Sequence, residues 1–188
     1  EHPHGSTQEL TEALEARIGE LGYNLDTWAG RHSDRRARAI VENLASYLVG
    51  VPGRVDVEQK VEAQVEGVTI RGRMDRLEYV DEGVRVTDLK TGGNSDPYRK
   101  VDENAQLAAY QLALLASGED VAGARIALLG TKKKPQTFDQ KPLQGEALAQ
   151  WRNKVREVAE SARGPYFEAR PSDAACAYCS FDRLCPAR

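Results

Sequence analysis

The sequence predicts an α/β fold in which a mixed central β-sheet is flanked by helices within one domain. Three segments rich in β-branched residues follow one another along the chain, at 55–65, 69–79 and 84–90. A short apolar run predicts a further strand at 124–130, and apolar residues recur at helical spacing in four segments, at 8–21, 33–49, 102–117 and 144–163. This order of helices, three strands, helix, strand and helix is typical of a mixed sheet covered by helices.

The composition is that of an ordinary soluble globular protein, with 40% hydrophobic and 29% charged residues among 188. No run of about 18 apolar residues is present, so no membrane span is expected. No signal peptide is visible, and we expect a cytoplasmic protein. The chain begins at Glu1 without a methionine, which suggests an N-terminally truncated fragment.

The net charge of −3 gives no global basic field for nucleic acid. Two local basic runs, Arg31–Arg38 and Lys132–Lys134, could nevertheless contact phosphates. For any single residue in them, a solvated surface is the interpretation that we favour.

Three charged residues fall at the end of the hairpin formed by the second and third strands. A turn centred on Asp81 and Glu82 places Asp75 directly opposite Asp88. Opposed carboxylates repel each other unless a cation lies between them, and Lys90 projects to the same side as Asp88 because strand residues two apart point the same way. Two carboxylates and a lysine around Mg²⁺ or Mn²⁺ can cleave a phosphodiester.

The alternative for this group is a solvated acidic pair at a strand end. Val84 and Val86 share the face of Asp88, so the carboxylates are expected to border the core, where an unpaired charge is costly. We therefore favour the metal site. Glu58, on the polar side of strand 55–65, is expected to be solvated rather than catalytic.

On the helix after the hairpin, Gln106 and Tyr110 are four residues apart and project from one face. They can contact a substrate and orient the lysine, or they can belong to a helix that packs on the sheet with Tyr110 in its core. The spacing favours neither alternative.

The last 13 residues hold all three cysteines, in the pattern Cys176-x2-Cys179-x5-Cys185. An odd number argues against a disulfide framework. The clustering indicates a metal site in a reducing compartment.

Four motifs in this order resemble the RecB-like branch of the PD-(D/E)XK nucleases, which occur in AddAB/AdnAB-type helicase–nucleases that process double-strand breaks. They are GRMDR, VTDLKTG, Gln-x-x-x-Tyr on the next helix and the C-terminal cysteines. The resemblance spans residues 55–188, and the motifs are weak singly but specific together. It implies a restriction-endonuclease-like core.

The resemblance also implies a role for each matching residue. Asp75, Asp88 and the backbone carbonyl of Leu89 would bind the metal, and Lys90 would be the catalytic lysine. Gln106 and Tyr110 would form the family's additional motif near the DNA.

The chain departs from the family pattern in two places. The metal-contacting histidine of the family's first core helix has no match, since His2, His4 and His32 lack its context. A [4Fe–4S] cluster normally takes four thiolates, and the fourth cysteine is absent from this chain. One truncation before Glu1 would explain both gaps.

For the intact protein, the resemblance favours a structural [4Fe–4S] cluster on Cys176, Cys179 and Cys185. Zinc with Asp173 or Asp182 as a borrowed ligand, a cluster with an exogenous ligand, and metal-free thiols remain alternatives.

The sequence hypothesis is therefore a single nuclease domain over 1–188, with a helical part at 7–50, a catalytic core at 51–165 and a cysteine tail at 166–188. It would act as a Mg²⁺- or Mn²⁺-dependent DNA exonuclease in double-strand break repair and end resection. Its partners would be single-stranded DNA or an unwound duplex end, and a helicase region or subunit. The alternatives are a CRISPR-associated Fe–S exonuclease and a catalytically inactive DNA-binding scaffold.

Overall fold

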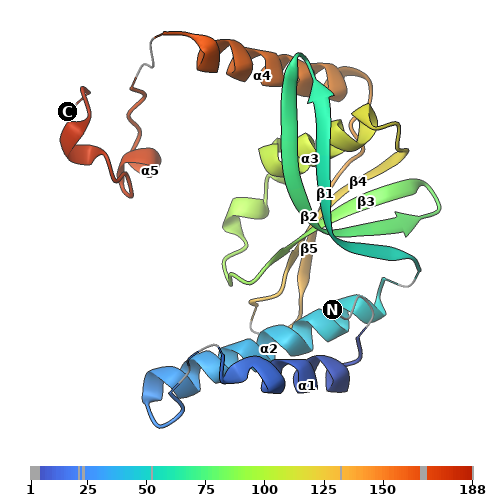
Figure 1. Ribbon diagram of the computed structural model, residues 1–188, viewed down its shortest axis with the longest axis vertical. Helices are drawn as coiled ribbons and strands as arrows, with labels where there is room; N and C mark the ends of the chain where they lie inside the picture. The colour runs from blue at the N-terminus through green and yellow to red at the C-terminus, as the bar shows by residue number, and fades with distance from the viewer. Residues whose placement is uncertain are drawn as a thin grey trace.

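A five-stranded sheet forms the centre of the molecule in the computed structural model, which describes residues 5–20, 22, 24–51, 53–131, 133–165 and 169–187 (Figure 1). The strands lie side by side in sequence order, as β1 (Val55–Val65), β2 (Val68–Val80), β3 (Gly83–Lys90), β4 (Val121–Leu128) and β5 (Gln136–Gln140). Only β3 and β4 are parallel, and the other neighbours are antiparallel. The predicted fold class, a mixed sheet flanked by helices, is confirmed.

Helices cover the sheet on opposite sides, with α1 and α2 together on one side and α3 on the other (Figure 1). The longer helices are α1 (Thr7–Ile18), α2 (Trp28–Val49), α3 (Ala105–Ala116) and α4 (Gly145–Arg163). Short helical segments follow β3 and form part of the tail: η1 (Asp96–Tyr98), η2 (Val101–Glu103), α5 (Asp173–Cys176) and η3 (Asp182–Leu184). The crossover from β3 through α3 to β4 is what a parallel strand pair requires.

The apolar core has a layer on each side of the sheet. The α3 side contains Leu107, Leu114, Val86 and Ile126. On the α1–α2 side, Leu10 and Leu48 pack near Ala127 and Leu129. Because β3 and β4 are covered on both sides, their carboxyl ends are held rigidly, and the candidate site lies at these ends.

The local sequence explains where the first two helices begin. Ser6 caps α1 with a full capping box to Glu9. α2 begins at Trp28, earlier than the predicted 33–49, because Thr27 rather than Ser33 is its cap and accepts a hydrogen bond from the Gly30 N–H. Gly30 and the polar run from Arg31 to Arg36 conceal the helical period, so the sequence pattern missed this first part of the helix.

The predicted and observed strands differ mainly at the sheet edge formed by β5. β5 was not predicted, because Gln136–Gln140 is polar and lies at an edge where the strand needs no apolar face.

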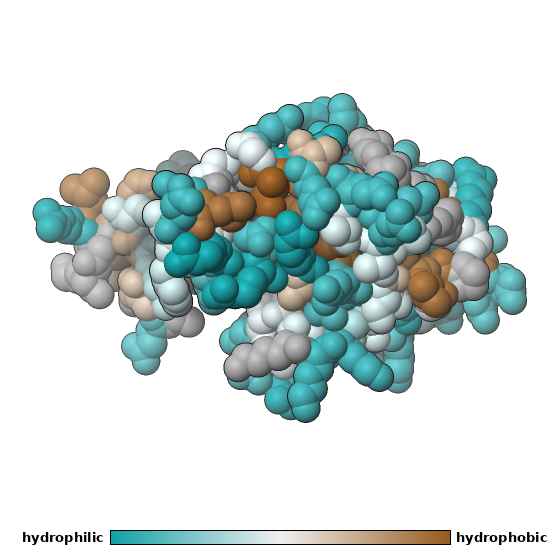
Figure 2. All heavy atoms as spheres, turned by 90° about the horizontal axis from the view of Figure 1, so that it is seen from below, coloured by the Kyte–Doolittle hydropathy of each residue, from teal (hydrophilic) through white to brown (hydrophobic). Residues whose placement is uncertain are grey.

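His2, His4 and Lys132 lie outside the described residues. No helix in the described part of the chain is both long and apolar enough to cross a membrane. Hydrophilic side chains cover most of the face seen from the α1–α2 side (Figure 2).

Candidate active site

The β2–β3 hairpin has the predicted register. Tyr79 pairs with Val84, and pairing continues to Arg76 and Thr87, the last pair before the two aspartates. On the other side of β2, the pairing with β1 is interrupted at Asp75 and Glu58, and Glu58 has a φ of 54°. A non-glycine residue with positive φ inside a strand marks a local kink. Asp75 therefore lies at a local interruption of the β1–β2 ladder, which resumes at Met74 and Gln59.

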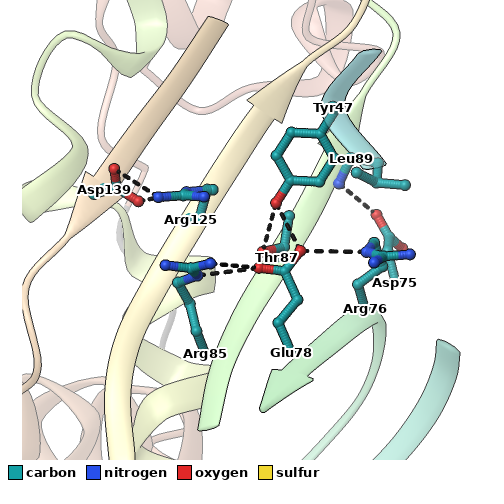
Figure 3. Close-up of polar contacts among 9 residues, drawn as sticks. All are labelled: Tyr47, Asp75, Arg76, Glu78, Arg85, Thr87, Leu89, Arg125 and Asp139. Atoms are coloured by element: carbon teal, nitrogen blue, oxygen red, sulfur yellow. Dashed lines mark hydrogen bonds and ion pairs between the residues drawn. The ribbon is translucent and has the colours of Figure 1, made fainter. Parts of the chain in front are cut away.

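The kink gives the Asp75 carboxylate a specific hydrogen bond. Its Oδ2 accepts from the backbone N–H of Leu89 at 2.8 Å (Figure 3). This contact joins β2 to β3 beyond Arg76 and Thr87, the last pair of their ladder, next to Asp88. Glu58 itself is exposed and pairs with Arg73 at 3.3 Å.

Asp88 is a buried carboxylate, 4% exposed, that meets two polar side chains. Gln106 of α3 donates to its Oδ1 at 2.9 Å, and Lys90 Nζ lies 2.7 Å from its Oδ2. Lys90 is the one polar partner of Oδ2 among the residues that the structure describes. Asp88 thus keeps one buried oxygen with coordination capacity to spare.

Burial and charge act in opposite directions on this pair. Burial raises the pKa of the Asp88 carboxyl; Lys90 opposes the rise, Asp75 adds to it, and Gln106 opposes it more weakly. Burial also disfavours the Lys90 ammonium, but Asp88 outweighs that effect and raises the pKa of Lys90. Burial is the largest single effect on both pKa values, but it sets the net direction only at Asp88, because at Lys90 the hydrogen bond and charge of Asp88 together outweigh it. Lys90 is therefore protonated at neutral pH and provides a fixed positive charge beside two carboxylates.

Gln106 and Tyr110 connect α3 to this group. Gln106 Nε2 lies 3.4 Å from the Tyr110 hydroxyl, and Lys90 Nζ lies 3.4 Å from the Gln106 Oε1. The Tyr110 hydroxyl donates to the Arg73 carbonyl of β2 at 2.8 Å. The aromatic ring also lies against Gly72, where a Cβ would come within 2.8 Å of it. Gln106 therefore contacts both Asp88 and Lys90, while Tyr110 is linked to them through Gln106. The spacing of the two residues alone did not establish this.

Side chains of α2 hold the backbone segments that follow β3 and β4 at the site. Asn43 is buried and donates to the carbonyls of Leu129 and Thr131, while Arg36 donates to the Thr91 carbonyl at 3.2 Å. Gly130 lets the segments after β3 and β4 touch, since a Cβ there would lie 2.1 Å from the Thr91 carbonyl oxygen. These contacts fix the backbone immediately after Lys90.

A buried charge network lies on the α2 side of the same two strands (Figure 3). Glu78 has no exposed surface and receives hydrogen bonds from Tyr47 at 2.6 Å and Arg85 at 2.9 Å. Arg76, next to Asp75, donates to the same carboxylate at 3.3 Å. Burial, followed by the charge of Glu78, raises the pKa of Tyr47 to about 12, so its hydroxyl keeps the proton that it donates.

Sequence reasoning missed this network and the α2 contacts. The available signal was two charged residues, Arg76 and Glu78, alternating with Leu77 and Tyr79 in the middle of a predicted strand. Such a pattern normally indicates a solvated face. Only the packing of Tyr47 against them shows that the face is buried.

The donor set at the strand ends suits a hard divalent cation. Mg²⁺ is commonly held by one or two carboxylates and keeps several waters, and this site offers Asp75, Asp88 and the nearby Leu89 carbonyl. The observation that supports this fit is the buried Asp88 carboxylate, whose Oδ2 meets only the Lys90 ammonium among the described residues. In the described part of the chain, no group of three or more His, Cys, Asp or Glu side chains could hold a metal, so carbonyl or water oxygens would complete the coordination.

The cysteine tail does not form a comparable site. Cys179 is exposed, Cys176 and Cys185 are half-buried, and all three are free thiols. The described tail does not gather them into a metal-binding group. The side chain of Asp182 lies outside the described residues, and Asp173 is exposed. The residues present do not fit a cluster, which stays a prediction for a longer protein.

The family follows from comparison with known proteins. The family model of the PD-(D/E)XK nuclease superfamily matches residues 1–186, and this chain belongs to that superfamily. The Gene 69 protein of Mycobacterium phage D29 is 26% identical over 183 residues, which cover 85% of this chain and 64% of that protein. The chain thus spans less than two thirds of the length of this relative.

A solved structure with a similar fold comes from a protein described as an exonuclease. A candidate exonuclease from Eubacterium rectale superposes with a TM-score of 0.56 at 15% identity, over 95% of this chain and 70% of that one. At this level of identity the likeness concerns the fold alone. The AddAB/AdnAB-type assignment is finer than these comparisons and belongs to the proposal below.

Proposed function

We propose that this chain is the nuclease domain of a DNA-processing enzyme and hydrolyses single strands from their ends, with a divalent metal ion. The observation that carries the proposal is the group of Asp75, Asp88 and Lys90 at the end of the β2–β3 hairpin, in which the buried Asp88 carboxylate lies 2.7 Å from the Lys90 ammonium. Membership of a nuclease superfamily supports the same chemistry.

The mechanism assigns a task to each side chain. Asp75, Asp88 and the Leu89 carbonyl would hold Mg²⁺ or Mn²⁺, which when bound activates water and offsets phosphate charge. Lys90 supplies a positive charge to the phosphate oxygens as negative charge develops on them. In the overall reaction, water forms a new oxygen–phosphorus bond, and the phosphorus–oxygen ester bond on the leaving side breaks.

Two further residues keep this arrangement fixed. Gln106 orients the Asp88 carboxylate through its 2.9 Å hydrogen bond. Tyr110 anchors α3 to the β2 backbone at Arg73, so the helix cannot drift from the strand end. Preorganisation of this kind removes the cost of arranging the groups during the reaction.

The biological setting extends the proposal. A helicase–nuclease in double-strand break repair would supply the unwound end, and the motif order in the sequence supports this setting. The exonuclease description of the Eubacterium rectale protein supports action from ends. The iron–sulfur cluster belongs to the proposal only for a longer protein that brings a fourth ligand.

A cleavage assay tests the enzyme class and the end requirement together. We expect the purified chain to degrade linear single-stranded DNA with Mg²⁺ or Mn²⁺ and to be inactive after chelation with EDTA. A covalently closed circle of the same sequence should resist cleavage. Cleavage that persists in EDTA, or no cleavage with either metal, contradicts a metal-dependent nuclease. Equal cleavage of circle and linear strand contradicts action from ends.

A further inference from the structure

The N-terminal half of α2 carries aromatic and basic side chains along one side. Trp28, His32, Arg35 and Arg36 recur at spacings of four, seven and eight residues from the first, which brings them to neighbouring positions on the helix surface. The rings of Trp28 and His32 are stacked, with centroids 5.3 Å apart and planes 12° from parallel. Trp28 is nonetheless 70% exposed, so its other contacts leave most of the indole open. We call these four residues the α2 stripe.

The arginines of this region differ in whether their charge is neutralised by an ion pair. Arg38 is neutralised by Glu15 at 2.9 Å and by Asp34 at 3.2 Å. Arg36 donates only to the neutral Thr91 carbonyl, and Arg35 has no polar partner among the residues that the structure describes. Asp34, the acidic residue inside the run, is already engaged by Arg38. The positive charges of Arg35 and Arg36 are therefore available to an external anion.

The α2 stripe leads to the candidate active site. Arg36 contacts the carbonyl of Thr91, the residue that follows Lys90. From Arg36 the stripe extends for about 12 Å along the helix to Trp28, at 1.5 Å per residue. Figure 1 shows the N-terminal end of α2 extending to one side of the sheet. All four residues of the α2 stripe are exposed.

We propose that the α2 stripe binds single-stranded nucleic acid and guides it to Asp88 and Lys90. An open indole offers a stacking surface to any unpaired base, and two unpaired arginines beside it suit the phosphates of the same strand. Stacking needs unpaired bases, so the stripe selects single strands over duplex. The proposal rests on the nuclease function for its substrate class, and it adds the residues that hold the strand outside the reacting centre.

Binding without cleavage gives the cleanest test. The probe is a fluorescein-labelled oligothymidine, its binding to the 188-residue chain is followed by fluorescence anisotropy, and EDTA is present throughout. Trp28→Ala should weaken binding by roughly 5- to 150-fold, the effect of losing one stacked base. The double variant Arg35→Gln, Arg36→Gln should weaken binding and flatten its salt dependence, by about 0.7 in the logarithmic slope for each lost phosphate contact.

Arg38→Gln is the matched control. It removes, from the same helix, an arginine that makes no contact with the strand because its charge is paired with Glu15 and Asp34, so binding should fall far less than in the double arginine variant. Circular dichroism checks that each variant folds, and Arg35→Gln alone serves if loss of the Arg36–Thr91 contact disturbs the fold. A duplex of equal length should bind more weakly and be insensitive to Trp28→Ala.

The outcomes separate this proposal from the function on which it rests. Binding by the Trp28 and arginine variants that matches the Arg38→Gln control overturns the α2 stripe, even if the unmodified chain cleaves DNA. No measurable binding by the unmodified chain overturns it as well. Strand binding that depends on the α2 stripe, in a chain that fails the cleavage assay, supports the stripe and contradicts the nuclease.

Discussion

Replacing Lys90 with alanine is expected to lower metal-dependent cleavage of single-stranded DNA by roughly 100- to 1,000-fold, the usual cost of removing one preorganised charge-stabilising group. Asp88→Ala should abolish cleavage, because it removes the buried carboxylate around which Lys90 and Gln106 are arranged. Both effects are measured as initial rates on an end-labelled linear strand under saturating Mn²⁺.

Two surface substitutions on the same sheet serve as controls. Lys60→Ala removes an exposed lysine of β1, and Asp81→Asn changes the turn at the far end of the β2–β3 hairpin. Neither should alter the rate. Circular dichroism should show native secondary structure in all four variants. If folded Lys90→Ala or Asp88→Ala keeps full activity, the site assignment is wrong.

The second large effect concerns stability. Glu78→Ala is expected to lower the free energy of unfolding by about 3–5 kcal/mol, because it leaves the buried Arg76 and the partly buried Arg85 without their shared carboxylate. For a chain of this size the melting temperature should fall by roughly 6–20 °C. Urea unfolding and differential scanning calorimetry measure the two quantities.

An exposed pair on the same sheet provides the comparison. Glu62 and Arg71 also form an ion pair, at 3.0 Å, but their side chains are 61% and 72% exposed. Solvent screens such a pair, so Glu62→Ala should change the melting temperature little. Equal shifts in the two variants would mean that the network around Glu78 adds nothing beyond a surface pair.

The hairpin shows how far local pattern can predict a site. The register of β2 and β3 follows from the alternation of apolar and polar residues and from one short turn, and both are local properties of the sequence. The kink at Asp75 does not follow from them, because it depends on the positive φ of Glu58 in a different strand. The sequence therefore predicts the neighbourhood of Asp75 and Asp88, but not the hydrogen bond from Leu89 that orients the first carboxylate.

Residues that depend on tertiary packing escaped the sequence analysis. Asn43 and Arg36 reach backbone carbonyls more than 50 positions away, and no periodicity reveals such contacts. Tyr47 reads as a member of an apolar helical stripe, yet its hydroxyl completes the shell of Glu78. An interpretation based on sequence pattern assigns charged residues on strands to the solvent-exposed face. A buried charge network can therefore be recognised only when the position of the covering helix is known.

The central claim is that Asp75 and Asp88 share one divalent cation beside Lys90, and a crystal structure of the chain with Mn²⁺ tests it most directly. Anomalous scattering locates manganese independently of the protein phases. We predict a single strong peak that both carboxylates coordinate, and its absence in crystals of Asp88→Ala. A structure at millimolar Mn²⁺ with no metal bound to either carboxylate would contradict the claim.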